Sequence, residues 1–290
     1  MGEGRYQTSR CAGGAGSDGG SAPPYNRNVV PILTFDLETV PDVQALRQLR
    51  PQWATLGDRE VALQAFAERR ERTGNEFLPL HLHRVVAIGC AFRDDAGFRV
   101  RCLGSTDETE ARLIADFFRL IERYVPQLVS WNGGGFDLPV LQYRALIHGV
   151  AARRYWDQGE DDRDLRFNNY VNRYHMRHID LMDVLSHFQV RAAAPLDEVA
   201  RLAGFAGKLG MDGSRVWDAY CDGQIERIRA YCQTDVVNTY LLHCRFRKMR
   251  GQLDEAQYAA ELQLVRDTLA ASEESVWQEF LSAWPATPGR

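Results

Sequence analysis

The sequence lacks the features that mark membrane, secreted and disulfide-bonded proteins. No stretch approaches the ~18 to 20 consecutive apolar residues that cross a bilayer, and the N-terminus has no apolar segment typical of a signal peptide. The six cysteines form no CxxC pair, and most of them lie within apolar strand or helix patterns. We therefore expect a soluble, cytoplasmic protein with no membrane partner, whose cysteines are reduced core residues and not metal ligands.

The chain also lacks an excess of basic residues, because its formal net charge is −4. This balance excludes a broadly basic surface. It does not exclude a nucleic-acid partner, since bound cations and a local arginine cluster can supply the positive field. With 290 residues, 45% of them hydrophobic, the chain can build one large core, and a single catalytic domain is the expected organisation.

Composition divides the chain into three parts. Residues 1–28 are rich in Gly, Ser, Ala and Pro, which predicts a flexible tail. The apolar run 29–35 predicts a buried strand that ends at Asp36 and presents this carboxylate at its tip. We assign residues 29–250 to the catalytic domain and 251–290 to a helical C-terminal extension.

Hydrophobic periodicity predicts the order of the elements within the catalytic part. This order fits an α/β fold with a ribonuclease H-like mixed sheet flanked by helices, and a helical C-terminal part. The expected elements are a hairpin over 84–103, an amphipathic helix over 107–124, a strand over 127–131, a helix over 138–147, and almost unbroken helical patterns after 177.

Two carboxylates follow the first predicted strand at alternating positions. On a strand, Asp36 and Glu38 point to one face, while Phe35 and Leu37 point into the core. Such a face can bind a cation. The same pattern also occurs on strands whose polar face is simply solvated.

A glycine-rich turn precedes the helix over 138–147. Three consecutive glycines, Gly133 to Gly135, allow the backbone to approach another chain or a ligand closely. We expect Phe136 to pack beneath the turn and Asp137 to cap the helix. A capping role and a catalytic role for Asp137 are compatible.

Tyr231 and Asp235 are four residues apart in a long predicted helix over 224–248. At this spacing a phenol and a carboxylate share one helix face. Polar pairs at this spacing are also common without any function.

The segment around His178 has two interpretations. Asp180 and Asp183 fit a strand-to-helix junction at which they cap a helix, and this is the interpretation we favour. The alternative is that His178, Asp180 or Asp183 reaches the functional site.

The motifs F-D-x-E-T, N-G-x-x-F-D-x-x-x-L and Y-C-x-x-D occur in this order. Together they resemble the three exonuclease motifs of the DEDDy superfamily, and most closely those of the proofreading exonuclease domain of family B DNA polymerases. The chain is similar to a bacterial family of stand-alone predicted 3′-5′ exonucleases over roughly residues 29–250. The DEDDh subtype has a histidine five residues before Asp235, where Ala230 stands here, so Tyr231 indicates the DEDDy subtype.

The resemblance implies a metal-dependent 3′-5′ exonuclease that releases nucleoside 5′-monophosphates from single-stranded nucleic acid, preferentially DNA. It implies two divalent cations, Mg²⁺ or Mn²⁺, which prefer hard carboxylate oxygens. Asp36 would bridge both cations, Glu38 and Asp235 would complete the site on the side of the nucleophile, and Asp137 would hold the second cation. Tyr231 would hydrogen-bond the attacking water.

Further residues are candidates for binding the strand. An arginine- and aromatic-rich segment, 153–177, suits phosphate contacts and base stacking, or else is a polar excursion that its aromatic residues hold to the core. Lys208 resembles the auxiliary lysine of the family B exonucleases. The candidates are Thr39, Asn132, Phe136, Arg166, Arg173 and Lys208.

Three alternatives remain open from the sequence. An RNA exonuclease of the ribonuclease D type would use the same carboxylates and tyrosine. A non-catalytic nucleic-acid-binding module on the same fold would not need them. A truncated polymerase is disfavoured because the segment after Asp235 is far too short for a polymerase domain, so any proofreading would act in trans.

Overall fold

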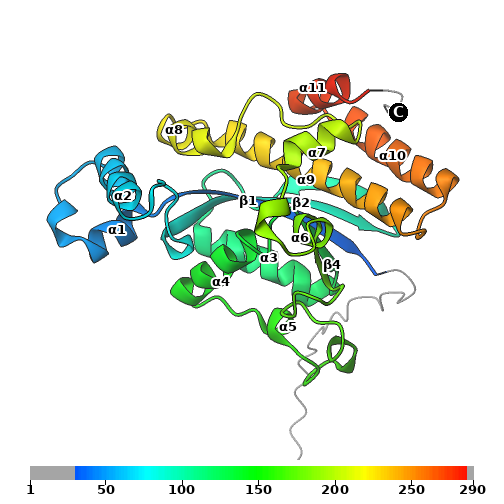
Figure 1. The fold of residues 1–290 in the computed structure, drawn as a ribbon, viewed down its shortest axis with the longest axis horizontal. Coiled ribbons are helices and arrows are strands. Elements are labelled where there is room, and N and C mark those ends of the chain that lie inside the picture. Colours follow the sequence, from blue (N-terminus) through cyan, green and yellow to red (C-terminus); the bar gives the residue numbers. More distant parts are fainter. Residues whose placement is uncertain (1–29, 286–290) are drawn as a thin grey trace, which may run out of the picture.

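The computed structural model describes residues 30–285, with a five-stranded mixed sheet at its centre (Figure 1). The strand order is β3-β2-β1-β4-β5. β2 is antiparallel to both β1 and β3, whereas β4 is parallel to both β1 and β5. The predicted mixed sheet is therefore confirmed. The strands are β1 (Ile32–Pro41), β2 (His83–Asp94), β3 (Gly97–Cys102), β4 (Gln127–Ser130) and β5 (His178–Asp180).

One face of the sheet is covered by α3 (Glu110–Tyr124) and α4 (Asp137–His148). Leu33, Phe35 and Leu37 of β1 pack there in a buried apolar cluster with both helices. The Phe35 ring lies 5.1 Å from the Phe117 ring of α3, measured between centroids. The odd-numbered side chains of β1 thus form the core on this side, as the alternation of a strand requires.

The opposite face is covered by α9 (Ile225–Met249), which is buried along most of its length. Ile32 and Val40, at the two ends of β1, both pack in clusters that contain α9 residues. Asp36 and Glu38 lie between them on the same even-numbered face. The two carboxylates are therefore enclosed between the sheet and α9.

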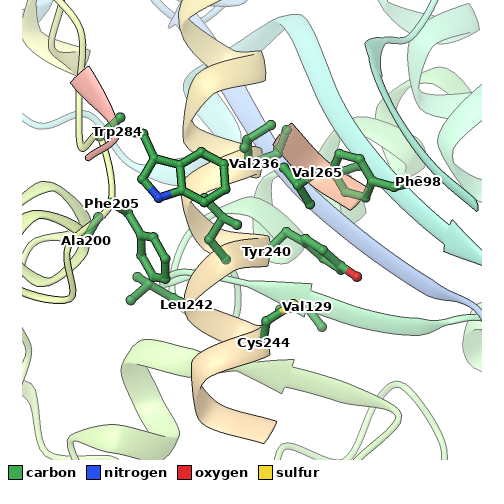
Figure 2. Close-up of a cluster of buried hydrophobic side chains, with 14 of the residues drawn as sticks. Phe98, Val129, Ala200, Phe205, Val236, Tyr240, Leu242, Cys244, Val265 and Trp284 are labelled. Carbon is green, nitrogen blue, oxygen red and sulfur yellow. The ribbon is translucent and has the colours of Figure 1, made fainter. Parts of the chain in front are cut away.

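The outer side of α9 is covered by α7 (Leu196–Leu202), α10 (Glu255–Ala270) and α11 (Ser275–Ala283). Figure 2 shows the resulting cluster, in which Tyr240 of α9 faces Phe98 with ring centroids 4.8 Å apart. The helical C-terminal part is confirmed. Because α10 and α11 share this core with α9, they pack as part of the same body (Figure 1).

The remaining helices are short or peripheral. The first two form a projection beside the end of β1 with an apolar cluster of their own (Figure 1). No helix within residues 30–285 is long and apolar enough to cross a membrane. These helices are α1 (Val43–Leu49), α2 (Asp58–Thr73), α5 (Arg153–Trp156), α6 (Leu181–Leu185) and α8 (Val216–Cys221).

Two sequence expectations are wrong. The first strand does not end at Asp36 but runs on to Pro41, because β2 pairs with it through Glu38 and, after an irregularity, on to Pro41. The parallel neighbour β4 pairs only with Ile32 to Thr34, so the carboxylates lie within the strand, beyond the reach of β4. The helical pattern after 177 is interrupted at once by β5.

Two further expectations remain predictions. The tail predicted for residues 1–28 lies outside the residues that the structure describes. The domain boundary at residue 250 also remains untested.

Gly89 of β2 sets the distance between the sheet and α9. A Cβ atom at this position would lie 2.9 Å from Cys232 Sγ and 3.0 Å from the Cys232 carbonyl oxygen. Contacts this short to helix backbone cannot be relieved by turning a side chain. The bare glycine is therefore what lets α9 lie directly over Asp36, the residue that pairs with Gly89.

We predict that Gly89→Ala lowers the free energy of unfolding by about 1 to 3 kcal/mol, the usual range for overpacking a well-packed core. Urea denaturation measures the change. The matched control is Gly213→Ala, because a Cβ at Gly213 meets no atom within 4 Å and the residue is exposed. Equal denaturation midpoints for the two variants would contradict this account of Gly89.

Candidate active site

The carboxylates of β1 are the base of an acidic cluster. Asp36 is partly exposed and Glu38 is buried, both on the face that α9 covers. The thiol of Cys232 on α9 lies 3.6 Å from Asp36 Oδ2 and 3.4 Å from the Asp36 carbonyl oxygen. Asp36, Glu38 and Cys232 can each offer a ligand atom, and these three atoms lie within 4.8 Å of one another.

Asp137 joins the cluster from the first turn of α4. Its Oδ1 accepts a hydrogen bond of 2.9 Å from the Leu37 amide, at the part of β1 that β4 does not reach. The carboxylate thus takes the place of a neighbouring strand. The predicted capping role is wrong, because Phe136 occupies the N-cap position and Asp137 is the first helical residue.

Asp235 and Tyr231 come from α9, one turn apart as predicted. Lys208 joins them from the segment after α7. Its Nζ lies 3.0 Å from Asp235 Oδ2 and donates a hydrogen bond to the Tyr231 hydroxyl. Lys208 and Lys248 are the only lysines of the sequence, and the structure places the first of them at the acidic cluster.

Burial and mutual repulsion perturb these carboxylates. Burial raises the pKa of Asp36 well above its usual range, and the charges of Asp137 and Asp235 raise it further. Burial also raises the pKa of Glu38 and Asp235, and it raises the pKa of Asp137 to about 7. The charge of Lys208 favours the ionised form of Asp235 and so opposes part of this increase, but the pKa of Asp235 remains above its usual value.

This electrostatic state fits a divalent-cation site. The Asp235 Oδ1 atom is buried and has no hydrogen-bond partner, although buried carboxylate oxygens normally have one. Repelling carboxylates with a free ligand atom are stabilised by a cation placed among them. Asp36, Glu38, Asp137 and Asp235 offer the hard oxygen ligands that Mg²⁺ and Mn²⁺ prefer.

Sequence reasoning missed the position of Cys232. We expected the cysteines to be buried core residues, and Cys90, Cys102, Cys232 and Cys244 are indeed buried and free. Cys232, however, also lies against Asp36. The signal was in the sequence, since Cys232 is three residues before Asp235, a spacing that places both on neighbouring parts of one helix face.

The segment around His178 contains the helix cap that we favoured, and the charge of Asp180 also raises the pKa of Asp137. Asp180 is the N-cap of α6, where its side chain accepts from the Asp183 amide. It also accepts hydrogen bonds of 2.9 Å from the Asn132 amide and 2.8 Å from the Gly134 amide. His178 Nε2 lies 2.8 Å from Ser130 Oγ. Asp180 therefore fixes the glycine turn that leads into Asp137.

The candidates for strand binding are distributed over two regions. Thr39 Oγ1 lies 2.9 Å from His83 Nδ1, and the ring of Phe136 packs edge-on against the His83 ring. Asn132 adopts a positive φ of 65° in the glycine turn. Thr39 directly follows Glu38 in the chain, and Asn132 and Phe136 belong to the turn that leads into Asp137.

The segment 153–177 is only partly available to a ligand. Tyr155 and Tyr170 are buried and stacked, so they hold the segment to the core. Arg173 pairs with Asp183 at 2.9 Å, and Asp183 lies close to the glycine turn at Gly134. Further out, the Arg166 guanidinium lies over the exposed ring of Phe167.

The fold and the site define an α/β domain with a mixed sheet and an acidic cluster between β1, α4 and α9. Residues 75–284 match the family described as predicted 3′-5′ exonucleases related to the exonuclease domain of PolB, so the chain belongs to that family. The matched range contains Asp137, Lys208, Tyr231 and Asp235. Asp36 and Glu38 precede it, and their place in the site follows from the geometry of β1.

Two individual proteins are similar to this chain. The chain is 26% identical over 149 residues to a DNA polymerase of Archaeoglobus fulgidus, an alignment that covers 50% of this chain and 19% of the polymerase. It is also similar to the structure of the family B DNA polymerase from the hyperthermophilic archaeon Pyrobaculum calidifontis, with a TM-score of 0.49 and 19% identity, over 88% of this chain and 29% of the polymerase. The chain thus spans less than a third of either polymerase.

The pKa of Asp137 predicts a pH dependence of stability for the metal-free protein. The folded protein keeps a proton on Asp137 up to about pH 7, whereas the unfolded chain releases it near the ordinary aspartate pKa of 3.8. The folded state therefore binds more protons in this window, and in EDTA the free energy of unfolding should fall as the pH rises from about 4 to about 7.

Asp137→Asn should reduce this loss of stability with rising pH, because the amide side chain does not titrate. Each pKa unit corresponds to about 1.4 kcal/mol. The amide oxygen of Asn can still accept the hydrogen bond from the Leu37 amide. Urea unfolding at several pH values measures the slope. The exposed Asp95→Asn serves as the matched control. An unchanged slope in Asp137→Asn would show that Asp137 is ionised throughout.

Proposed function

We propose that this chain is a metal-dependent 3′-5′ exonuclease that acts on single-stranded DNA. The observation that carries the proposal is the convergence of four carboxylates with Tyr231 and Lys208 at one site. The family description supports the 3′-5′ direction, and the similarity to a DNA polymerase favours DNA over RNA. The carboxylates are Asp36, Glu38, Asp137 and Asp235.

In the proposed reaction water attacks the terminal phosphodiester, the bond from phosphorus to the 3′-oxygen breaks, and a nucleoside 5′-monophosphate leaves. Asp36, Glu38, Asp137 and Asp235 would hold two divalent cations, Mg²⁺ or Mn²⁺. When bound, these cations would lower the pKa of water and offset the negative charge that develops on the phosphate oxygens.

Tyr231 and Lys208 would orient the attacking water. Burial, with the charges of Asp235, Glu38 and Asp36, raises the pKa of Tyr231 far above its usual value, so the phenol stays protonated. A protonated phenol can donate or accept a hydrogen bond, so we expect it to orient the water and not to act as the base. Burial disfavours the charged form of Lys208, but Asp235 and its neighbours outweigh this effect and raise the pKa of Lys208. Lys208 thus remains a cation.

The direct test is digestion of oligonucleotides that carry a label at the 3′ or the 5′ end, prepared as matched DNA and RNA strands. With Mg²⁺ or Mn²⁺ we expect shortening from the 3′ end, release of nucleoside 5′-monophosphates, and faster cleavage of DNA. EDTA should abolish cleavage. Shortening from the 5′ end would refute the proposed direction. Faster cleavage of RNA than of DNA would identify RNA as the substrate.

Two variants separate the roles within the same assay. Asp36→Asn should reduce cleavage to background, because it removes a charged ligand while preserving the shape of the side chain. Tyr231→Phe should cost less than the ~10²- to 10⁴-fold typical of acid–base catalysis by one side chain, and should lower the rate equally at all pH values. Loss of an alkaline limb of the pH–rate profile in Tyr231→Phe would instead identify Tyr231 as the base.

We further propose that the exposed part of segment 153–177 guides the strand. Arg173 lies beside the glycine turn that precedes Asp137, and the exposed rings of Phe167 and Tyr174 next to Arg166 and Arg173 suit base stacking. We expect the phosphates of a strand that leaves the acidic cluster to pass these arginines.

Replacing Arg166 and Arg173 together by Ala should raise KM with little change in kcat. It should also flatten the salt dependence of KM, by about 0.7 in logarithmic slope for each phosphate that the variant no longer neutralises. Arg112→Ala on α3, exposed and paired with Asp116, is the matched control outside segment 153–177. If the double variant and the control give the same KM and salt slope, segment 153–177 is structural only.

A further inference from the structure

The acidic cluster contains a sulfur atom that the proposed reaction does not use. Cys232 Sγ lies 3.6 Å from Asp36 Oδ2, and the ligand atoms of Asp36, Glu38 and Cys232 lie within 4.8 Å of one another. Hard cations such as Mg²⁺ have little affinity for sulfur, whereas Zn²⁺ and Cd²⁺ bind thiolates strongly. The composition of the site therefore favours a second class of cation.

We propose that Asp36, Glu38 and Cys232 form a site for a thiophilic divalent cation, Zn²⁺ or Cd²⁺, that inhibits the exonuclease by competing with Mg²⁺ or Mn²⁺. The proposal rests on the proposed function, because Asp36 and Glu38 are shared between the two kinds of cation. It adds a regulatory metal of a different chemistry to the same cluster.

Asp235 adds a further carboxylate from the same helix as Cys232. Its Oδ1 is buried without a hydrogen-bond partner, and Asp235 is 3% exposed. Cys232 and Asp235 are three residues apart on α9, so their side chains leave neighbouring parts of one helix face. Asp36, Glu38 and Cys232 supply three ligand atoms, the number that the protein provides in zinc sites whose fourth position stays open.

The sulfur atom of Cys232 is a thiol in the metal-free protein and would bind a cation by losing its proton. The Gly89 amide donates a hydrogen bond of 3.1 Å to Cys232 Sγ, which would stabilise negative charge on the sulfur. Burial raises the pKa of the Cys232 thiol, and its hydrogen bond with Cys102 and the charges of Asp36 and Glu38 raise it further, so a cation that binds the sulfur has to displace the proton. On binding, the S–H bond breaks, a sulfur–metal bond forms and the proton passes to the buffer, with no change of oxidation state.

The distinguishing consequence is a contrast between cations. Zn²⁺ binds nitrogen, oxygen and sulfur sites more tightly than Mn²⁺ or Mg²⁺ does, and a thiolate widens this difference. Low concentrations of Zn²⁺ should therefore inhibit cleavage in the presence of Mg²⁺, and excess Mn²⁺ should relieve the inhibition. A site made of carboxylates alone would show a smaller difference in affinity between Zn²⁺ and Mg²⁺ or Mn²⁺.

The test uses Cd²⁺ as a spectroscopic probe on the full-length protein without nucleic acid, because a bond between cadmium and a thiolate gives a charge-transfer band in the ultraviolet. Wild-type protein and Cys244→Ser should both show the band, and Cys232→Ser should lose it. Cys244 is the matched control, since it is a free, buried cysteine on the same helix. A band of unchanged intensity in Cys232→Ser would overturn the proposal.

Two further measurements keep the test decisive. Relative to Cys244→Ser, Cys232→Ser should raise the Zn²⁺ concentration for half-inhibition by about tenfold or more, as removal of one metal ligand predicts. If Cys232→Ser does not fold, a Mn²⁺ titration of the wild-type band decides, because Mn²⁺ shares Asp36 and Glu38 and should reduce it. A band that persists in saturating Mn²⁺ would overturn the shared site.

These results are independent of the test of the exonuclease. A Cd²⁺ band that depends on Cys232, in a protein that cleaves no strand, would refute the proposed function and retain the cation site. Cleavage from the 3′ end by a protein that shows no Cd²⁺ band would support the proposed function and refute the cation site.

Discussion

The structure depends on holding like charges close together in a partly buried space. Four carboxylates meet between the sheet and α9, where burial and mutual repulsion raise their pKa values. The groups that oppose this repulsion include the Lys208 ammonium at Asp235, the Leu37 amide at Asp137 and the Cys232 thiol at Asp36. The remaining negative charge makes the cluster a receptor for cations, and it requires a rigid surrounding framework to keep the carboxylates in place.

A buried ion-pair network supplies part of that framework. Arg144 of α4 is 3% exposed and pairs with Asp42 Oδ2 at 2.6 Å and with Glu110 of α3. Asp42 directly follows β1, and Glu110 also accepts from the Val85 amide of β2. The network thus joins the strand that carries Asp36 and Glu38 to the helix that begins with Asp137. Removing one partner from such a network leaves a buried charge uncompensated, which typically costs about 3 to 5 kcal/mol.

The same enclosure explains why different parts of the site have different chemistry. The side towards β4 and the glycine turn is built from backbone amides and carboxylates, which suit hard cations and phosphate. The side towards Gly89 contains sulfur, because α9 lies so close to β2 that only small side chains fit. The requirement for close packing therefore places a soft ligand next to hard ones, and the chemistry of Cys232 follows from the shape of the core.

The sequence alone determined those features of the site that depend on local periodicity. The alternation of β1 placed Asp36 and Glu38 on one face, and helical spacing paired Tyr231 with Asp235, since strands and helices repeat every 2 and ~3.6 residues. The length of β1, the hydrogen bond from Leu37 to Asp137, the contact of Lys208 with Asp235 and the position of Cys232 were decided only by the tertiary structure. Each of these depends on strand pairing or on packing between layers, that is, on contacts between segments far apart in the sequence, which no local pattern encodes.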